Sequence, residues 1–285
     1  MTVVPMPRTR LRWLTFLVVS ILSLTACGGA RHDTSEVYYL VVANTRIEYW
    51  QEAAAGLSAA AREMGVRAEM LGPETYDPQA EKDTLMKAVR QNIPPTGILV
   101  SPADPELMRE AIDSAVAAGI PVVTIDSDSP KSKRLLFVGT NNYDAGQMGG
   151  DILVKELNGK GTVVVYSILG QENLNERLEG YKRAIARQPG IKIVQVIDIR
   201  GETTKAFEAT RGLLDKKTVP DALVCLEALA CAEVADVLDR ANIRGKTIIA
   251  MDTNDTTLEW IRKGMIRTTI AQKPYTMAFH GPARN

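Results

Sequence analysis

The chain has 285 residues, of which 45% are hydrophobic and 24% charged, and its 34 basic residues are balanced by 34 acidic ones. This size and composition indicate a globular protein with one large core or two smaller ones, and they exclude a disordered or fibrous chain. Balanced charge provides no dense basic face for phosphates, so no nucleic-acid partner is expected. No apolar run reaches the roughly 18 residues of a membrane-spanning helix, which excludes a polytopic membrane protein.

The first 26 residues have the three parts of a secretory signal peptide. A basic start holds three arginines between residues 8 and 12, and the apolar stretch from Trp13 to Leu24 follows. The segment from Leu24 to Cys27 resembles the lipobox of bacterial lipoproteins, which implies that cleavage leaves Cys27 to carry lipid. We therefore expect residues 1–26 to be removed and residues 27–36 to form a lipidated N-terminus and tether. The mature protein is expected in the periplasm or at the cell surface, anchored to a membrane.

From Val37 onward, short apolar runs alternate with longer amphipathic stretches such as residues 174–187 and 202–215. This alternation is typical of parallel sheets covered by helices, and Gly, Pro, Asn or Asp bounds each run. The pattern restarts once, so we expect an α/β protein with two doubly wound parallel-sheet lobes. The predicted strands are 37–43, 66–71, 97–101, 121–125 and 135–138 in the first lobe, and 162–167, 192–197, 222–226, 247–251 and 267–270 in the second.

Polar side chains follow six of the ten predicted strands. The carboxyl ends of parallel strands and the helix N-termini after them converge at one edge of a sheet, where ligands bind in such folds. Capping of the following helix is the alternative for any one of these residues taken alone. Together they predict a site for a polar ligand. The residues are Asn44, Asp126, Ser127, Asp128, Asn141, Asn142, Glu227, Asp252 and Gln272.

No catalytic or metal-binding motif competes for these positions. His32 and His280 lie away from every strand-end cluster, so a serine or cysteine nucleophile would lack its base, and no glycine-rich phosphate loop is present. With Cys27 in the tether, only Cys225 and Cys231 remain, which excludes a Cys/His zinc cluster. Two buried thiols are favoured for this pair. A disulfide remains the alternative, because the export signal indicates an oxidising compartment. We expect no enzyme activity, no cofactor and no metal.

Short motifs across residues 37–281 resemble the ribose-type sugar-binding proteins of bacterial ABC importers. The resemblance implies the type I periplasmic binding protein fold, with residues 37–139 and 272–285 in an N-terminal lobe, residues 140–271 in a C-terminal lobe, and a hinge between them. Regulators similar to the lac repressor share the fold but carry a DNA-binding helix-turn-helix where this chain has a signal peptide. The motifs are Asp126 after the strand 121–125, Val138-Gly139-Thr140-Asn141-Asn142-Tyr143 with Gly146, Asn175-Glu176-Arg177 with Gly180, Met251-Asp252, and Thr269-Ile270-Ala271-Gln272 with Pro274.

The resemblance places one sugar between the lobes, with aromatic rings against its C–H faces and planar polar groups on its hydroxyls. For Tyr49 and Trp50, ordinary core packing is the alternative. Asn175 and Arg177 both fall where the family contributes an arginine, and which of them faces the ligand is left open. The implied ligand-binding residues are Tyr49, Trp50, Asp126, Ser127, Asn175, Arg177, Glu227, Asp252 and Gln272.

Three departures from the family pattern bear on the ligand. Ser127 replaces an arginine of ribose binders, Glu227 replaces an asparagine, and the third aromatic residue is missing near Arg200-Gly201. A buried carboxylate without a partner is costly, so the added charge must be compensated either by Arg177, with Arg200 or Lys273 as further candidates, or by a positively charged ligand. These departures argue against ribose itself and leave the identity of the sugar open.

The resemblance implies a monomeric receptor that delivers a monosaccharide-like ligand to an ABC permease and performs no chemistry. A sensor that presents its ligand-bound form to a membrane chemoreceptor or kinase is the alternative. The family continues a few dozen residues beyond the Gln272 segment, so the C-terminal end is expected to be shortened, with two hinge strands in place of three.

Overall fold

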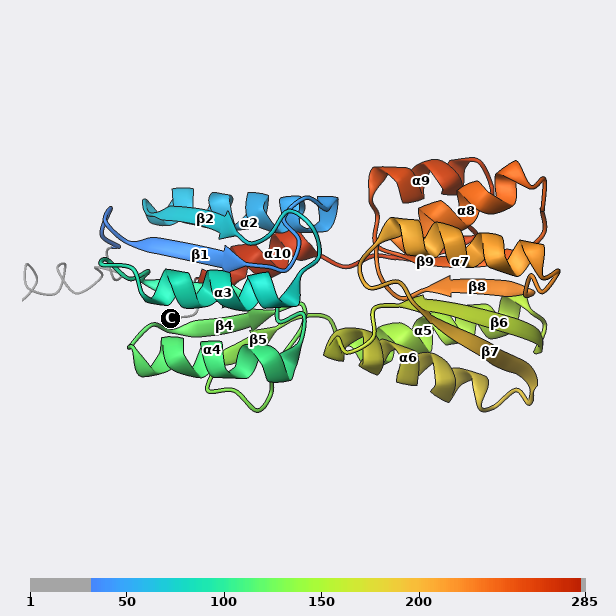
Figure 1. Ribbon diagram of the computed structural model, residues 1–285, viewed down its shortest axis with the longest axis horizontal. Coiled ribbons are helices and arrows are strands. Elements are labelled where there is room, and N and C mark those ends of the chain that lie inside the picture. The colour runs from blue at the N-terminus through green and yellow to red at the C-terminus, as the bar shows by residue number, and fades with distance from the viewer. Residues whose placement is uncertain (1–31, 283–285) are drawn as a thin grey trace, which may run out of the picture.

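The computed structural model describes residues 32–282, which form two lobes of similar build (Figure 1). Each lobe contains one parallel five-stranded sheet, so the predicted α/β fold with two doubly wound sheets is confirmed. The first sheet has the order β2-β1-β3-β4-β5 and the second β10-β9-β8-β6-β7. The strands are β1 (Val37–Val41), β2 (Arg67–Leu71), β3 (Gly97–Val100), β4 (Val122–Ile125), β5 (Leu136–Val138), β6 (Lys160–Ser167), β7 (Gly190–Asp198), β8 (Ala222–Cys225), β9 (Thr247–Met251) and β10 (Thr268–Ile270).

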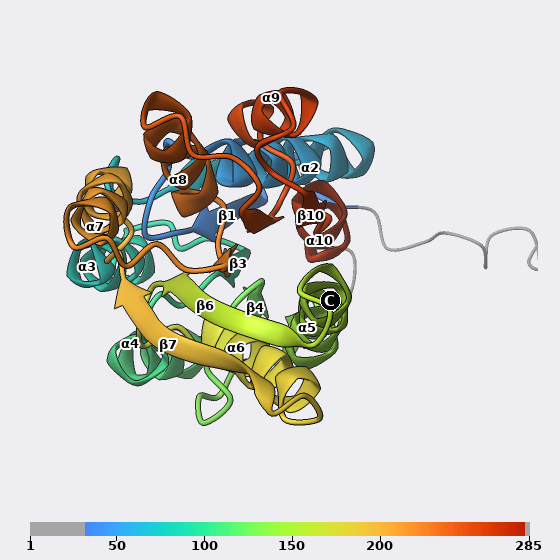
Figure 2. The ribbon, with the colours of Figure 1, turned by 90° about the vertical axis from the view of Figure 1, so that its right-hand side faces the viewer.

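Helices cover both faces of each sheet. In the end-on view of Figure 2, α5 and α6 lie on one side of β6, and α7 and α8 lie on the other. Among the described residues, no helix is long and apolar enough to cross a membrane. The helices are α2 (Glu48–Met64), α3 (Pro78–Val89), α4 (Pro105–Ala117), α5 (Asn142–Glu156), α6 (Glu172–Ile185), α7 (Thr203–Asp215), α8 (Ala230–Arg240), α9 (Asp255–Arg262) and α10 (Pro274–His280).

The core of the first lobe follows from the alternation of side chains along its strands. Leu40 and Leu99 pack toward α2 and α10, while their neighbours Val41 and Ile98 pack toward α3 and α4. Successive residues of a strand point to opposite faces, so continuous apolar strands are stable only where helices cover both. The apolar runs of the sequence are therefore central strands of a two-sided sheet.

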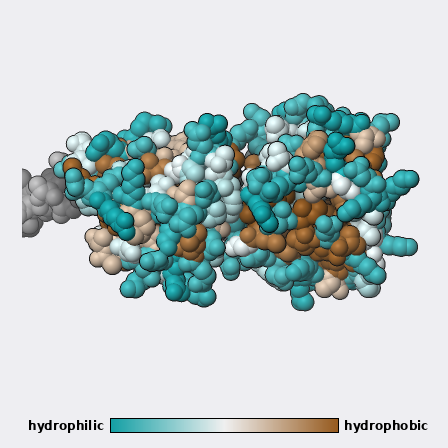
Figure 3. All heavy atoms as spheres, in the orientation of Figure 1, coloured by the Kyte–Doolittle hydropathy of each residue, from teal (hydrophilic) through white to brown (hydrophobic). Residues whose placement is uncertain are grey.

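The chain passes between the lobes after β5 and again after β10, and α10 then returns to pack against α2 (Figure 1). The two crossings are joined by a hydrogen bond of 2.8 Å from the Thr140 hydroxyl to Gln272 Oε1. On the front of the second lobe, hydrophobic residues gather over β6, β7 and β8 (Figure 3), and the edge strand β7 leaves Val194 56% exposed.

Cys225 and Cys231 form a disulfide, so the preference for two buried thiols is wrong. Cys225 ends β8 and Cys231 lies in the first turn of α8, which brings their Cα atoms to 5.7 Å. That separation is within the range that a disulfide spans. The bond encloses the loop that carries Glu227.

Candidate functional site

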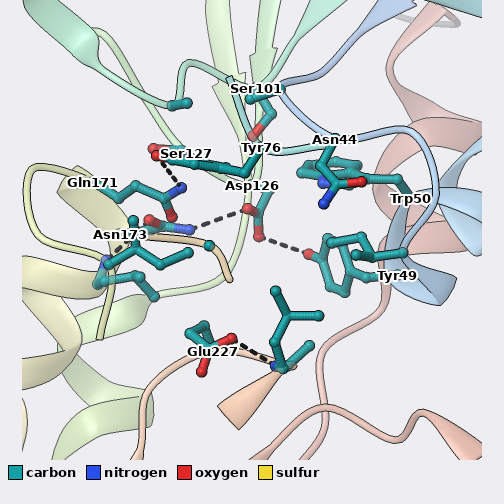
Figure 4. A pocket seen from close by; sticks show the side chains of 18 of the residues that line it. Asn44, Tyr49, Trp50, Tyr76, Ser101, Asp126, Ser127, Gln171, Asn173 and Glu227 are labelled. Carbon is teal, nitrogen blue, oxygen red and sulfur yellow. Dashed lines mark hydrogen bonds between the residues drawn. The ribbon is translucent and has the colours of Figure 1, made fainter. Parts of the chain in front are cut away.

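A cavity lies between the lobes, where the carboxyl ends of the strands of both sheets face each other (Figure 4). About 650 Å³ of space free of protein atoms lies in it, a volume that includes solvent at its open side. Rings and polar groups share its surface. The residues with aromatic, polar or charged side chains are Asn44, Tyr49, Trp50, Tyr76, Ser101, Asp126, Ser127, Gln171, Asn173, Arg177, Glu227, Asp252 and Gln272.

Eight of the nine residues expected to contact the ligand line this cavity, and Asn175 does not. Asn175 is exposed, because residues two apart on a helix point in different directions and Arg177 already faces inward. Asn173 takes the place instead, since it is one helical turn before Arg177 and shares its face. The expectation for Asn175 is therefore corrected to Asn173.

Tyr49 and Trp50 lie in the first turn of α2 and form an aromatic pair with ring centroids 4.9 Å apart at 90°. Both belong to the core of the first lobe, and both line the cavity. Each ring therefore packs in the core, as the alternative has it, and also lines the cavity, as expected for a residue that faces a ligand. The Tyr49 hydroxyl donates a hydrogen bond of 2.6 Å to Asp126 Oδ1, which fixes both groups at the cavity wall (Figure 4).

Asp126 and Asp252 occupy matching places, directly after β4 and β9, and both have left-handed backbone angles, with φ of 62° and 67°. Aspartate tolerates this conformation better than most residues, and such strained positions cluster at functional sites. Asp126 Oδ2 also accepts from Asn173 Nδ2 at 3.1 Å, a bond that joins the lobes (Figure 4). Burial raises the pKa of Asp126, although the Tyr49 hydrogen bond and the Arg177 charge oppose this.

Arg177 is buried, and its guanidinium is held by three acceptors. It donates to the Leu226 carbonyl, to Asn142 Oδ1, and at 3.3 Å to Gln272 Oε1. Arg177 Nε has no partner among the described residues. The arginine can sit here because α5 and α6 approach closely: a Cβ on Gly146 would lie 2.0 Å from the Arg177 carbonyl oxygen.

Glu227 is compensated by the start of α8 and forms no ion pair among the described residues. Its two carboxylate oxygens accept from the backbone N–H groups of Leu229 at 2.6 Å and Ala230 at 3.0 Å. Helix N-termini stabilise negative charge in this way. Burial nevertheless raises the pKa of Glu227 to about 7, against the lowering effect of the two N–H groups.

Asp252 is the third buried carboxyl of the cavity. It accepts from Gln272 Nε2 at 3.1 Å, and burial raises its pKa to about 6, while the nearby charge of Arg177 lowers it. Arg177 is the single lysine or arginine among the described residues that line the cavity. The cavity therefore holds three acidic groups and one permanent cation, an arrangement suited to a ligand with many hydrogen-bond donors.

Five of the aromatic or polar lining residues were missing from the expected contacts: Asn44, Tyr76, Ser101, Gln171 and Asn173. Asn173 and Gln171 lie at or just before the start of α6, which begins two residues earlier than the predicted segment 174–187. Tyr76 lies in the loop after β2, and its place beyond a strand end was the one available indication. Ser127 Oγ is buried at the cavity without a partner among the described residues. No group of His, Cys, Asp or Glu within residues 32–282 is arranged to hold a metal ion.

The chain matches a known protein family and resembles known proteins in sequence and structure. Residues 38–281 match the model of the periplasmic binding protein domain. The ribose import binding protein of Haemophilus influenzae is 27% identical over 62% of this chain and 60% of its own length, and so the match spans less than two thirds of that relative.

Solved structures extend the similarity to nearly the whole described region. An ABC transporter solute-binding protein from Burkholderia graminis, in complex with D-arabinose, has a TM-score of 0.82 at 26% identity, covering 88% of each chain. A chain of the XylFII–LytSN complex has a TM-score of 0.82 at 31% identity, covering 87% of this chain and 91% of that one.

Proposed function

Because this chain belongs to the periplasmic binding protein domain family, as a type I member of the ribose class, we propose that it captures a monosaccharide-like ligand between its lobes. In this proposal it is an exported, monomeric receptor that delivers the ligand to an ABC permease, and it catalyses no reaction. The observation that carries the proposal is the cavity itself, where rings of one lobe face acidic and amide groups of the other.

The chemistry of this cavity suits a sugar. The rings of Tyr49 and Trp50 offer an apolar wall to C–H faces, and the buried carboxylates Asp126 and Asp252 offer acceptors to adjacent hydroxyls. Arg177 Nε and Ser127 Oγ supply donors that no described residue satisfies. A ligand that completes these bonds stabilises the closed lobes, because it contacts both walls only when they meet.

A thermal-shift screen against D-ribose, D-arabinose, D-galactose and D-glucosamine tests the proposal. A sugar present at about 100 times its Kd adds roughly 2.7 kcal/mol to the free energy of unfolding. We expect a clear rise in melting temperature with at least one sugar, and its loss in Asp126→Asn. Arg183→Ala, an exposed position on the same helix as Arg177, is the control and keeps the shift. A flat response to every sugar and polyol would contradict sugar capture.

We also propose that Cys27 anchors the protein to a membrane through lipid, although this cysteine lies outside the described residues. The support is the lipobox-like segment that precedes it. Bacterial lipoproteins carry more than one acyl chain, which is enough for stable anchoring. Cys27→Ala should abolish palmitate labelling and release the protein from the membrane fraction. Unchanged labelling of this variant would exclude the anchor.

A sensor is the second candidate function, and the similarity to a chain of the XylFII–LytSN complex favours it. Both candidates use the same closed, ligand-bound form. Deletion of the gene distinguishes them: a transport receptor is required for uptake of labelled sugar, whereas a sensor is required for the transcriptional response to that sugar. Loss of uptake with a normal response would exclude the sensor.

A further inference from the structure

Tyr76 reaches from the first lobe into the second. It lies in the loop between β2 and α3, packs against the core of the second lobe, and accepts a hydrogen bond of 3.1 Å from Gln171 Nε2 (Figure 4). The loop is tied to the first lobe at both ends. Thr45 N donates to the Pro73 carbonyl at 2.8 Å, and Asp77 N donates to the Ala43 carbonyl at 3.0 Å. The ring is therefore a fixed projection of the first lobe.

The Tyr76 side chain packs against Gly201 of the second lobe. A Cβ on Gly201 would lie 2.4 Å from Tyr76 Cγ and 2.6 Å from Tyr76 Cβ. These atoms are close to the tyrosine backbone, so the ring cannot turn aside to make room. Gly201 also has a φ of +70°, a conformation that favours glycine. The lobes can meet in this arrangement only because residue 201 has no side chain.

Tyr76 and Gly201 line the same cavity. The sequence lacks an aromatic residue near Arg200-Gly201, on the second lobe, and the structure supplies a ring there from the first lobe. We propose that Tyr76 is a clasp, which closes this end of the cavity, limits the size of the ligand and stabilises the closed lobes before ligand binds. The part that concerns ligand size rests on the proposed sugar binding.

The clasp exists only in the closed arrangement, since its two halves belong to different lobes. Contact between the half-buried ring and the second lobe removes apolar surface from water, and this favours the closed form whether or not the cavity is filled. A ligand then meets a larger fraction of closed protein, which strengthens its apparent affinity. Removal of the ring should open the lobes and lengthen the cavity together.

Small-angle X-ray scattering of the ligand-free protein tests the clasp without any sugar. Tyr76→Ala and Gly201→Ala should each increase the radius of gyration relative to the unaltered chain. Gly264→Ala is the matched control, because Gly264 has a φ of +74° but a Cβ added there would meet no atom within 4 Å, so it shares the backbone strain without the clash. Equal radii in all four proteins would overturn the clasp.

Calorimetric titration with D-ribose, D-arabinose and lactose tests ligand size. Tyr76→Ala should weaken monosaccharide binding about tenfold and weaken lactose binding less, or create it. Tyr76→Phe keeps the ring and loses only the bond from Gln171, so it should bind like the unaltered chain. If Tyr76→Phe and Tyr76→Ala behave alike, the ring does not form the wall and the proposal fails.

The two proposals fail in different ways. If no sugar binds the unaltered chain but the scattering still separates Tyr76→Ala and Gly201→Ala from Gly264→Ala, sugar capture is wrong and the closing role of the clasp stands. If sugars bind Tyr76→Ala with unchanged affinity and size preference and its radius is unchanged, the clasp is wrong and sugar capture stands.

Discussion

The two walls of the cavity are built differently, although the lobes share one architecture. The first-lobe wall is the edge of a hydrophobic core, because Tyr49 and Trp50 belong to both. The second-lobe wall consists of buried polar groups, with Arg177 held by three acceptors and Glu227 held by the start of α8. One wall is stabilised by burial of apolar surface and the other by hydrogen bonds that offset the cost of burying charge.

This contrast indicates what each wall does for a ligand. A wall of aromatic rings makes non-directional hydrophobic contacts, so it accepts any apolar face of suitable size. A wall of fixed donors and acceptors discriminates among ligands, because an unmatched buried polar group is costly. We therefore expect the first lobe to contribute mainly to affinity and the second mainly to identity. The exceptions are the polar first-lobe residues Asn44, Ser101, Asp126 and Ser127.

The largest effect is expected from Trp50→Ala, because Trp50 belongs both to the cavity wall and to the hydrophobic core of the first lobe. Trp50 is 9% exposed, so its removal should lower the free energy of unfolding of the ligand-free protein by about 3–5 kcal/mol and also weaken sugar binding. Urea denaturation and calorimetry measure the two effects. Trp260→Ala, in α9 and away from the cavity, should keep full affinity. An unchanged unfolding energy for Trp50→Ala would remove the distinction between the walls.

A smaller effect on binding is expected at the second wall, together with a loss of stability, because buried acceptors lose their donor. Arg177→Ala removes the cation that faces three buried carboxyls, and sugar binding should weaken by about 2–5 kcal/mol. Arg177→Lys should restore little, because an ammonium cannot serve the three fixed acceptors in the plane of a guanidinium. Titration calorimetry measures both, with exposed Arg183→Ala as the control. Normal affinity in Arg177→Ala would mean that the ligand site lies elsewhere.

Part of the pH dependence of stability should come from the second wall. Glu227 has a pKa of about 7 in the folded protein against an ordinary value of 4.5, so between these pH values the folded chain binds more protons than the unfolded chain. Stability therefore falls as pH rises through this window, by up to roughly 3 kcal/mol from this group. Asp252, with a pKa of about 6, acts in the same direction.

Glu227→Gln removes this titration, and its free energy of unfolding should fall less between pH 5 and pH 7 than that of the unaltered chain. Urea denaturation at several pH values measures the slope. Exposed Glu179→Gln on α6 is the control and should leave the slope unchanged. The same slope in Glu227→Gln as in the unaltered chain would show that the carboxyl is not a buried acid of this wall.

The strands and the cavity could be predicted from sequence because both follow from local patterns. Apolar runs bounded by turn residues mark buried strands. Asp126 and Asp252 directly follow strands, and Glu227 lies two residues beyond one. Helix capping, the alternative for such residues, does hold at Asn141, whose side chain accepts from the Asp144 N–H at the start of α5. Local pattern cannot choose between capping and ligand contact.

The features that the sequence does not predict depend on the direction in which a side chain points or on contacts between residues that are far apart in the sequence. Asn175 was expected from the family motif around Arg177, whereas Asn173, one helical turn before Arg177, is the residue that shares its inward face. Tyr76 escapes prediction because its partners, Gln171 and Gly201, are far from it in the sequence and on the other lobe. The disulfide depends on the angle at which α8 leaves β8, which spacing alone does not fix.

The bond between Cys225 and Cys231 connects the ligand site to the conditions under which the protein is made. It closes a ring of a few residues around Glu227, so the acidic loop keeps its shape through a covalent tie as well as through the α8 N-terminus. Such bonds persist in oxidising compartments and are lost in the reducing cytosol. Recombinant material recovered from cytosol would thus present a looser acidic loop than secreted material, and preparations of identical sequence would differ in the very wall that selects the ligand.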